Sequence, residues 1–207
     1  DSKQGRLQFD NGAPIKREHF ASVVSMSQRR AMEYLERLLA AGVLSESADQ
    51  FFMSADIFYY GTVKKKSNAA FDFIRVYKGA VRNIYKDAGT KAAAQLALVY
   101  AVLPYVNKAT NVLCFNPHET DMEAVEFLTM QQLAQLLGYK DSRKLKTAMN
   151  KVLIDNEVVF CFTENPNNRR QTFVTLNPKV IFGGNNENLQ LIESHFNQRN
   201  NFSIDIN

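Results

Sequence analysis

The sequence lacks the features that mark several common classes of protein. It has only two cysteines, Cys114 and Cys161, and each lies in an apolar, strand-like run. We therefore expect reduced core residues rather than a disulfide or a metal site. No apolar run approaches the roughly 18–20 residues of a membrane-spanning helix, and no signal peptide opens the chain. These absences predict a cytoplasmic protein with no membrane partner.

Catalytic motifs are missing as well. The chain has no GxxxxGKS/T phosphate loop, no CxxC and no HExxH, and its three histidines are far apart with no His-x-His pair. His118 does stand near Glu119, Asp121 and Glu123, but acidic clusters on loops are usually solvated. The sequence therefore predicts a protein that is not an enzyme and that binds neither a metal nor a cofactor.

The charge is mildly positive and unevenly distributed. The net charge is only +4, which is too small to identify a polyanionic partner by itself. Residues 1–66 carry ten Lys/Arg against eight Asp/Glu, residues 67–126 six against six, and residues 127–184 eight against four. A polyanion would therefore meet two basic blocks separated by a neutral one.

The most informative feature that is present is an internal repeat, with one copy at Ile15–Gly61 and another at Leu128–Gly183. Each copy reads as a short helix, a turn, a longer helix, a Gly or Asn stop, and two strands that end in an aromatic-Gly pair. Identity between the copies is low. The shared order of these signals, rather than any single match, is what relates them.

Apolar residues at helical spacing define the helices of both copies. The short helices are predicted at Glu18–Val24 and Gln131–Leu137, and the longer ones at Gln28–Leu39 and Ser142–Leu153. Ser27 and Asp141 are good N-cap residues for the longer helices. Gly42 and Asn156 are the expected C-terminal stops, since both residue types tolerate a left-handed backbone.

Paired strands follow each longer helix. We expect Val43–Leu44 to pair with Phe51–Met53, and Glu157–Thr163 to pair with Gln171–Leu176. The second connection is rich in Asn and Pro and is the longer of the two. Together with the helices, this order predicts a winged helix-turn-helix unit in each copy.

In such a unit the second helix fits the DNA major groove, and the side chains of its first two turns reach bases and phosphates. The candidate contacts of the first copy are Gln28, Arg29, Arg30 and Tyr34. Those of the second copy are Ser142, Arg143, Lys144, Lys146, Thr147 and Asn150. Those of the second wing are Asn168, Arg169 and Arg170, which could enter the minor groove or hold phosphates. The alternative is a solvated, charged surface with no partner.

The predicted fold class is α+β, mostly α, with tandem winged helix-turn-helix units joined by a helical linker. We place the first unit at 1–66, the linker helix at 67–89, the second unit at 90–184, and a short helix with a flexible tail at 185–207. The first unit shows a strand at Arg6–Phe9 but no opening helix, so we expect that its N-terminus has been trimmed.

The segment Phe73–Gly184 resembles winged-helix proteins of Firmicutes plasmids and phages, including replication-initiator-like proteins. The resemblance is carried by FIRVY at 73–77, LPYVN at 103–107, LTM at 128–130 with LGY at 137–139, and NPKVIFGG at 177–184. It implies binding to double-stranded DNA, in control of replication initiation or transcription of a mobile element.

The function predicted from the sequence is sequence-specific binding of double-stranded DNA. Further partners would be a second copy of the chain or replication and transcription proteins. A different class of function stays open, because some winged helices bind only other proteins. The target sequence and the choice between replication and transcription are not encoded in these patterns.

Overall fold

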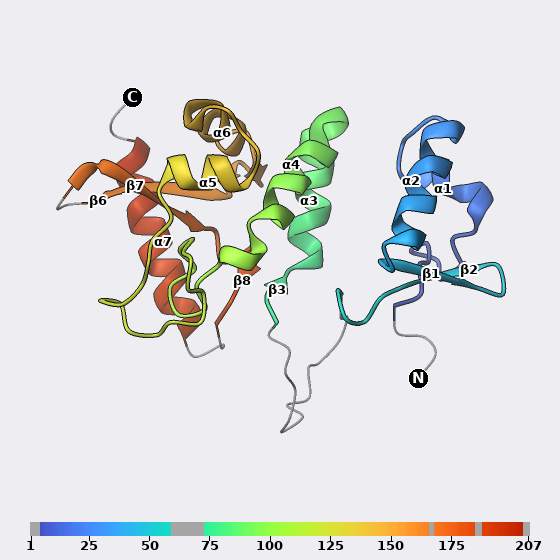
Figure 1. Ribbon diagram of the computed structural model, residues 1–207, viewed down its shortest axis with the longest axis horizontal. Coiled ribbons are helices and arrows are strands. Elements are labelled where there is room, and N and C mark those ends of the chain that lie inside the picture. Colours follow the sequence, from blue (N-terminus) through green and yellow to red (C-terminus); the bar gives the residue numbers. More distant parts are fainter. Residues whose placement is uncertain (1–4, 59–72, 166–167, 185–187, 205–207) are drawn as a thin grey trace, which may run out of the picture. The chain divides into compact units, whose positions relative to one another are not determined.

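The computed structural model describes residues 5–58, 73–165, 168–184 and 188–204, and within them the side chains except those of 90, 165, 168–171 and 199–204 (Figure 1). Helices and short antiparallel strand pairs make this an α+β protein. The chain divides into two compact units, Asp1–Ala70 and Phe71–Asn207, which are described separately below as unit 1 and unit 2.

Unit 1 follows the predicted order of elements. The helices are η1 (Arg17–His19), α1 (Phe20–Val23) and α2 (Gln28–Ala40), and the strands are β1 (Leu44–Ser47) and β2 (Gln50–Met53). The predicted stop of α2 is confirmed, because Gly42 has a φ of +67° just after the helix. Ser27 is the N-cap, although its side chain makes no capping hydrogen bond.

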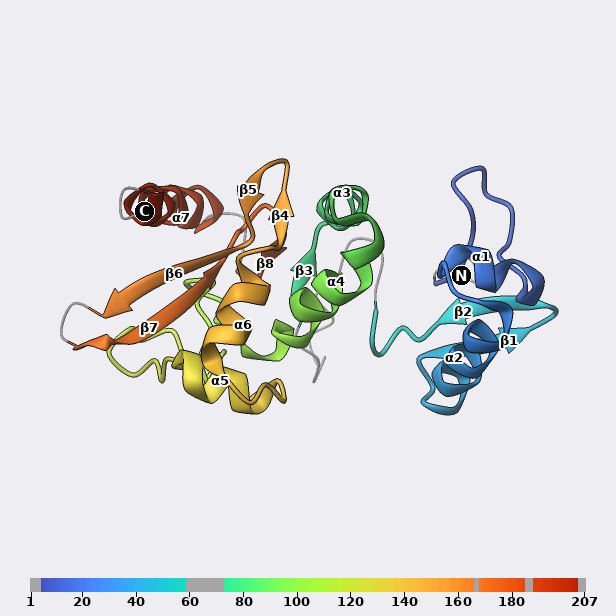
Figure 2. The ribbon, with the colours of Figure 1, turned by 90° about the horizontal axis from the view of Figure 1, so that it is seen from above.

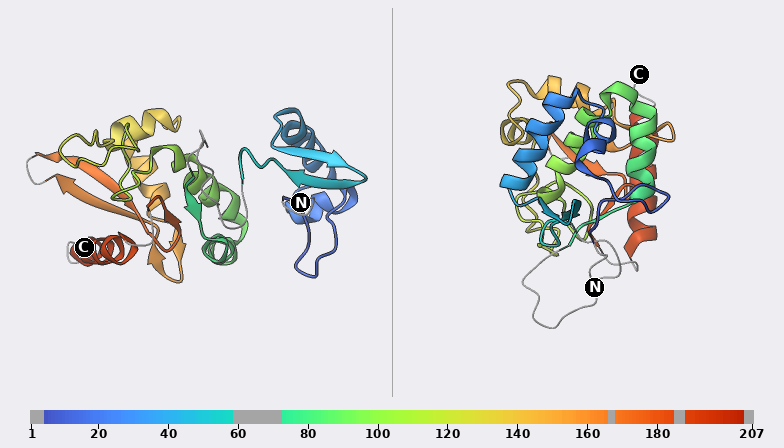
Figure 3. Two further views of the ribbon diagram at one scale, coloured as in Figure 1. Left: turned by 90° about the horizontal axis from the view of Figure 1, so that it is seen from below. Right: turned by 90° about the vertical axis from the view of Figure 1, so that its right-hand side faces the viewer.

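The core of unit 1 is small and lies between α2 and the β1–β2 hairpin (Figure 3). Ala31 and Leu35 of α2 are fully buried against Phe20 and Phe51. The segment at Arg6–Gln8 adds a third extended stretch, because the Leu7 N–H donates to the Phe51 carbonyl at 2.8 Å. This segment therefore pairs with the second strand of the hairpin.

Unit 2 holds the remaining elements. Its helices are α3 (Lys78–Ala88), η2 (Gly89–Lys91), α4 (Ala92–Ala101), η3 (Leu103–Tyr105), α5 (Met130–Leu136), α6 (Ser142–Met149) and α7 (Leu189–Ile204). Its strands are β3 (Arg75–Val76), β4 (Leu153–Ile154), β5 (Glu157–Val158), β6 (Phe160–Asn165), β7 (Asn168–Leu176) and β8 (Ile181–Phe182). One cluster of buried residues joins most of these elements into a single core.

The segment predicted as a linker helix differs in the structure. The helix is α3, and its residues Ala80 and Ile84 are buried in the core of unit 2. It packs against α4, and Asn83 Nδ2 donates to the Asp155 carboxylate at 3.1 Å. The apolar stripe of this helix thus faces the unit 2 core, so α3 is part of that unit.

The C-terminal end of α6 also differs from its prediction. The helix ends at Met149, whereas Val152 lies in the following turn and Leu153 begins β4. Asn156 has the left-handed φ that was expected, +64°, but it shares the tight turn between β4 and β5 with Asp155 at +49°. Asn156 therefore closes a hairpin rather than a helix.

The β6–β7 hairpin is covered on both faces (Figure 2). Helices α5 and α6 lie on one side, and α7 packs against β6 on the other with Ile192 and Phe196 buried. As predicted, this hairpin is longer than the β1–β2 hairpin. The expected short helix with a flexible tail is instead α7, which extends to Ile204.

Two further pairings close unit 2. The chain at Asn111–Leu113 pairs with β7, since the Leu113 N–H donates to the Val174 carbonyl at 2.9 Å. Asn111 is fully buried, and its amide donates to the carbonyls of Leu176 and Ile181 at 3.1 and 2.7 Å. At the edge of the unit, β3 pairs antiparallel with β8.

Candidate nucleic-acid interface

Helix α6 is anchored on one side and open on the other. Its N-cap is Asp141, as predicted, and the Asp141 carboxylate accepts the Arg143 backbone N–H at 2.8 Å. That hydrogen bond is the main reason why the pKa of Asp141 lies below its usual range. Leu145 and Met149 are fully buried. Arg143, Lys144, Lys146 and Thr147 are consequently left exposed on the outer face of the helix.

That outer face is cationic. Arg143, Lys144 and Lys146 are exposed, and no acidic residue lies within the sequence of α6. The Arg143 side chain is 91% exposed, and its guanidinium lies 3.5 Å from the N-cap carboxylate of Asp141. The Lys146 ammonium lies 5.1 Å from the ring centroid of Phe162 on β6, within the range of a cation–π contact. Lys146 thus connects α6 to the base of the hairpin.

The other predicted contacts of unit 2 share this face in part. Thr147 and Asn150 are exposed and Ser142 is half-buried. The Thr147 hydroxyl donates to the Arg143 carbonyl at 2.9 Å, so it can only accept a hydrogen bond from a partner. Asn168, Arg169 and Arg170 belong to β7, but their side chains lie outside the described residues. Their predicted contacts therefore stay predictions.

In unit 1 the predicted contacts Gln28, Arg29, Arg30 and Tyr34 are all exposed on α2. Arg29 has a partner within the helix, because its Nε donates to the Glu33 carboxylate at 3.0 Å. Tyr34 also has a neighbour within the unit, since its ring lies 6.4 Å from that of Phe20, centroid to centroid. The face is thus less cationic than that of α6.

Acidic side chains also engage a cation beside α2. The Arg17 guanidinium lies 2.6 Å from Glu36 and 2.7 Å from Glu46. These hydrogen bonds, first that to Glu46 and then that to Glu36, raise the pKa of Arg17. The guanidinium consequently stays charged and is already neutralised by its neighbours.

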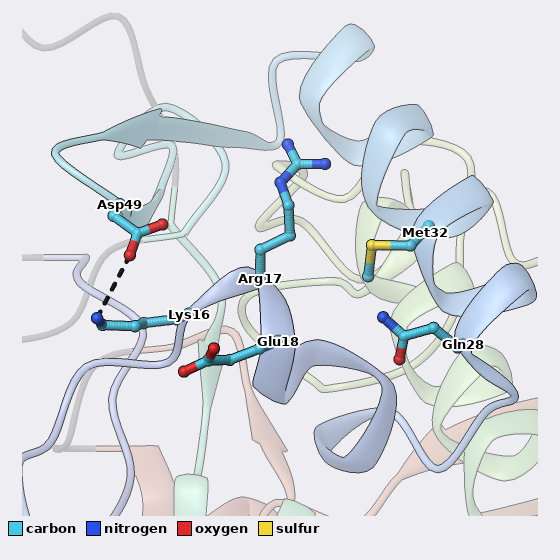
Figure 4. A pocket seen from close by; sticks show the side chains of 6 residues that line it. All are labelled: Lys16, Arg17, Glu18, Gln28, Met32 and Asp49. Atoms are coloured by element: carbon cyan, nitrogen blue, oxygen red, sulfur yellow. Dashed lines mark ion pairs between the residues drawn. The ribbon is translucent and has the colours of Figure 1, made fainter.

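A shallow pocket of about 330 Å³ lies next to Arg17 (Figure 4). Lys16 and Asp49 line one side and form an ion pair at 3.4 Å, while Gln28 and Met32 of α2 line the other. Both signs of charge meet here, so the pocket carries no net bias toward an anion. Of the predicted unit 1 contacts, only Gln28 is among its described lining residues.

Sequence reasoning missed several basic residues that packing brings to α6. Lys91 ends η2 and is the N-cap of α4, and Lys151 follows α6, yet both line a groove with Arg143 and Lys144. Lys91 is distant in sequence from the helix-turn-helix. No local pattern could have placed it there, because the packing of α4 against α6 is what sets the arrangement.

The described part of the chain was also searched for metal sites, disulfides and membrane-spanning helices. No group of three or more His, Cys, Asp or Glu side chains within it is positioned to hold a metal. Cys114 and Cys161 are both buried, and neither is in a disulfide. None of the described helices combines the length and the apolar character needed to cross a membrane.

The chain was compared with protein-family models, curated proteins and solved structures, and none of them matched. The arrangement of residues within the two units is therefore what bears on function.

Proposed function

We propose that this chain binds double-stranded DNA in a sequence-specific manner through tandem winged helix-turn-helix units, with α6 as the principal reading helix and without catalysis. The observation that carries the proposal is the outer face of α6. It presents Arg143, Lys144 and Lys146 without an intervening acid. A helix with a basic first two turns and an apolar back suits the major groove, where arginine and lysine read guanine edges.

The order and pairing of the elements support the tandem arrangement. In unit 1 the segment at Arg6–Gln8 precedes α1 and α2 and pairs with β2. In unit 2 the segment at Asn111–Leu113 precedes α5 and α6 and pairs with β7. In each unit two helices therefore lie between an extended segment and the hairpin strand with which it pairs. This order is typical of a winged helix, with the hairpin as the wing.

A specific observation favours a second role for unit 1. Its α2 face carries two glutamates among its arginines, and Glu33 and Glu36 pair with Arg29 and Arg17. Pre-formed ion pairs must be broken or shared before a phosphate can use the same cations. Unit 1 is accordingly the better candidate for contact with a protein, either a second copy of this chain or a replication or transcription protein.

The test is retention of the full-length chain on a pool of random duplexes at several salt concentrations, followed by sequencing of the tightest-bound fraction. DNA binding predicts salt-sensitive retention, with the log–log slope reporting the number of phosphates contacted. Specific binding predicts enrichment of one motif. Retention that is absent, or that does not respond to salt, would favour the protein-only alternative.

The proposed biological role is control of replication initiation or of transcription on a plasmid- or phage-type element. Recovery of DNA bound by the chain in cells distinguishes the two. An array of repeated sites at one origin supports replication, whereas sites scattered over promoters support transcription.

A further inference from the structure

A second basic surface lies beside α6 and shares Arg143, Lys144 and Thr147 with the outer face of that helix. A groove of about 410 Å³ is lined by residues of α4, of α6 and of their flanking turns. Helices α4 and α6 pack against each other within unit 2, and Figure 2 shows them side by side. None of the described residues that line the groove is acidic. The lining comprises Lys91, Ala94, Gln95, Leu98, Tyr139, Arg143, Lys144, Thr147, Ala148 and Lys151.

The cations of the groove come from both of its walls. Lys91 stands at the start of α4, whereas Arg143, Lys144 and Lys151 belong to α6 and the turn after it. Lys91, Lys144 and Lys151 are exposed, and they form no ion pair with a carboxylate of the described residues. The groove therefore concentrates positive charge, which the Asp141 carboxylate offsets in part at Arg143, 3.5 Å away.

The two walls are fixed relative to each other. Gln95 on α4 donates from its side-chain amide to the Lys151 carbonyl at 2.8 Å. Leu98, which lies nearby on α4, is almost fully buried. Because these contacts exist without a partner, binding an anion here does not require the helices to move together first.

The groove is suited to recognise a ligand by its negative charge rather than by a pattern of hydrogen-bond donors and acceptors. The Gln95 amide donates to the Lys151 carbonyl, and the Thr147 hydroxyl donates to the Arg143 carbonyl. Ammonium groups on flexible stems supply most of the remaining donors, and lysine acts on phosphate as a point charge. Such a surface suits a repeating phosphate backbone and gives no means of telling one base from another.

We propose that this groove holds one phosphodiester strand of the duplex whose bases α6 reads, with Lys91 and Lys151 as phosphate contacts on its two walls. The inference rests on the proposed function and adds to it the residues that position the duplex. Arg143 and Lys144 lie at the junction of the two surfaces. The groove therefore sets the depth and register at which α6 meets the bases.

The experiment compares Lys91→Ala with Lys151→Ala in one chain against Lys78→Ala with Lys86→Ala as the control. The control pair lies exposed on α3 and removes the same charge. Binding of the full-length variants to a random duplex and to a selected duplex is measured across a salt series. Thermal unfolding confirms that each variant is folded, and Lys→Gln replacements at the same positions give a second, more conservative pair.

The groove variant is expected to lower the log–log salt slope by about 1.8, which is about 0.9 for each of two phosphates. At about 0.15 M salt this corresponds to a fall in affinity on the order of 30-fold. The fall should be equal for random and selected duplexes, because phosphate contacts carry no sequence information. The control variant should keep the wild-type slope.

Three results would overturn the inference, and they separate it from the proposed function. If wild-type protein binds duplex DNA but the groove variant keeps its slope, the groove is not a phosphate site and the proposed function stands. If the slope falls equally in the groove and control variants, net charge explains the effect. If wild-type protein does not bind duplex DNA at all, the proposed function fails and the inference fails with it.

Discussion

At the scale of single residues, the cations of α2 and α6 differ in what surrounds them. Arg29 pairs with Glu33 one turn away, whereas Arg143 faces its own N-cap, and both side chains are at least 90% exposed. Exposed ion pairs contribute little to stability. Their effect here is on availability: the Glu33 carboxylate lies 3.0 Å from Arg29, whereas the Asp141 carboxylate lies 3.5 Å from Arg143. The cation that is held less closely can more readily meet a phosphate or a base.

Replacing Arg143 and Lys144 together with alanine is expected to weaken specific DNA binding without unfolding the protein. Both side chains lie away from the buried Leu145 and Met149, and a base-reading arginine contributes about 1–3 kcal/mol to discrimination. Affinity for a selected duplex at matched salt, together with a thermal unfolding curve, checks this. Wild-type affinity in a folded double variant would remove α6 from the interface.

Asp141→Asn is expected to make the stability of the folded protein less dependent on pH in the acid range. The pKa of Asp141 is lowered in the folded protein, chiefly by the Arg143 N–H. Its stabilising effect is therefore complete above about pH 4 and is lost as the pH falls through the lower, folded pKa. Thermal unfolding of wild type should drop more steeply than that of the variant between about pH 5 and pH 2. Equal pH profiles would show that the cap does not depend on charge.

The same substitution offers a second readout. Asparagine keeps a side-chain oxygen for the N-cap hydrogen bond, but it removes the carboxylate that lies near the Arg143 guanidinium. DNA affinity should accordingly rise at low salt and approach the wild-type value as salt screens the charge. A fall in affinity would mean that Asp141 orients Arg143 for binding.

At the scale of elements, the β6–β7 hairpin is the candidate wing. Replacing Arg169 and Arg170 with alanine should lower the salt slope by roughly 0.9 for each phosphate that the variant no longer neutralises. Both residues belong to the first part of β7, and arginines on a hairpin can enter the minor groove. A salt series with the full-length variant measures the slope. An unchanged slope would mean that the arginines point into solvent.

Local signals were enough to predict α2 from the sequence, because its ends are defined locally. Ser27 precedes the first turn in extended backbone, and Gly42 takes the left-handed conformation after the last one. The capping box of Thr129 and Gln132 at the start of α5 is likewise local. In each case the deciding residues lie within a few positions of one another.

The end of α6 could not be predicted in this way. Asparagine adopts positive φ both after helices and in tight hairpin turns, so Asn156 was compatible with either structure. Pairing of Leu153 with Val158 decides the outcome. The position of α3 was missed for a related reason. An apolar stripe shows that a helix is packed, but it does not show which unit the helix packs against.

The candidate site also contains residues that local sequence could identify and residues that only packing brings in. The cationic face of α6 follows from the order of residues within one helix, so its exposed members could be named from the sequence. Lys91 could not, because it reaches the groove only through the packing of α4 against α6. Contacts between distant segments depend on how whole helices pack, and the packing partners of a helix cannot be read from one sequence.

At the scale of the whole molecule, the proposed binding by tandem units predicts two DNA contacts, one for each unit. If both read the major groove, their contacts should recur at about 10–10.5 base pairs on one face of the duplex. Inserting half a turn between the two contacted segments should cripple binding, while a full turn should be partly tolerated. Footprinting and affinity measurements on duplexes with altered spacing check this.

Separation of the chain near Lys66 gives an independent check on the same prediction. Each half should bind far more weakly than the whole, because the tether makes the second contact intramolecular. If the 67–207 fragment alone matched the whole chain, and the footprint were short and insensitive to spacing, only unit 2 would read DNA. The ion-paired α2 of unit 1 would then be assigned to protein contact.

The pairing of β3 with β8 has a consequence for how the protein is made. It joins Arg75 to Phe182 and Val76 to Ile181, residues from opposite ends of the unit 2 core. The sheet of unit 1, by contrast, is complete once Met53 has been added. During translation unit 1 can therefore fold while most of unit 2 is still unmade, and unit 2 must wait until β8 and then α7 have left the ribosome. Distant pairings also form slowly. The nascent chain is thus expected to carry a folded unit 1 ahead of an unfinished unit 2, with the candidate DNA-reading helix among the last parts to gain its native support.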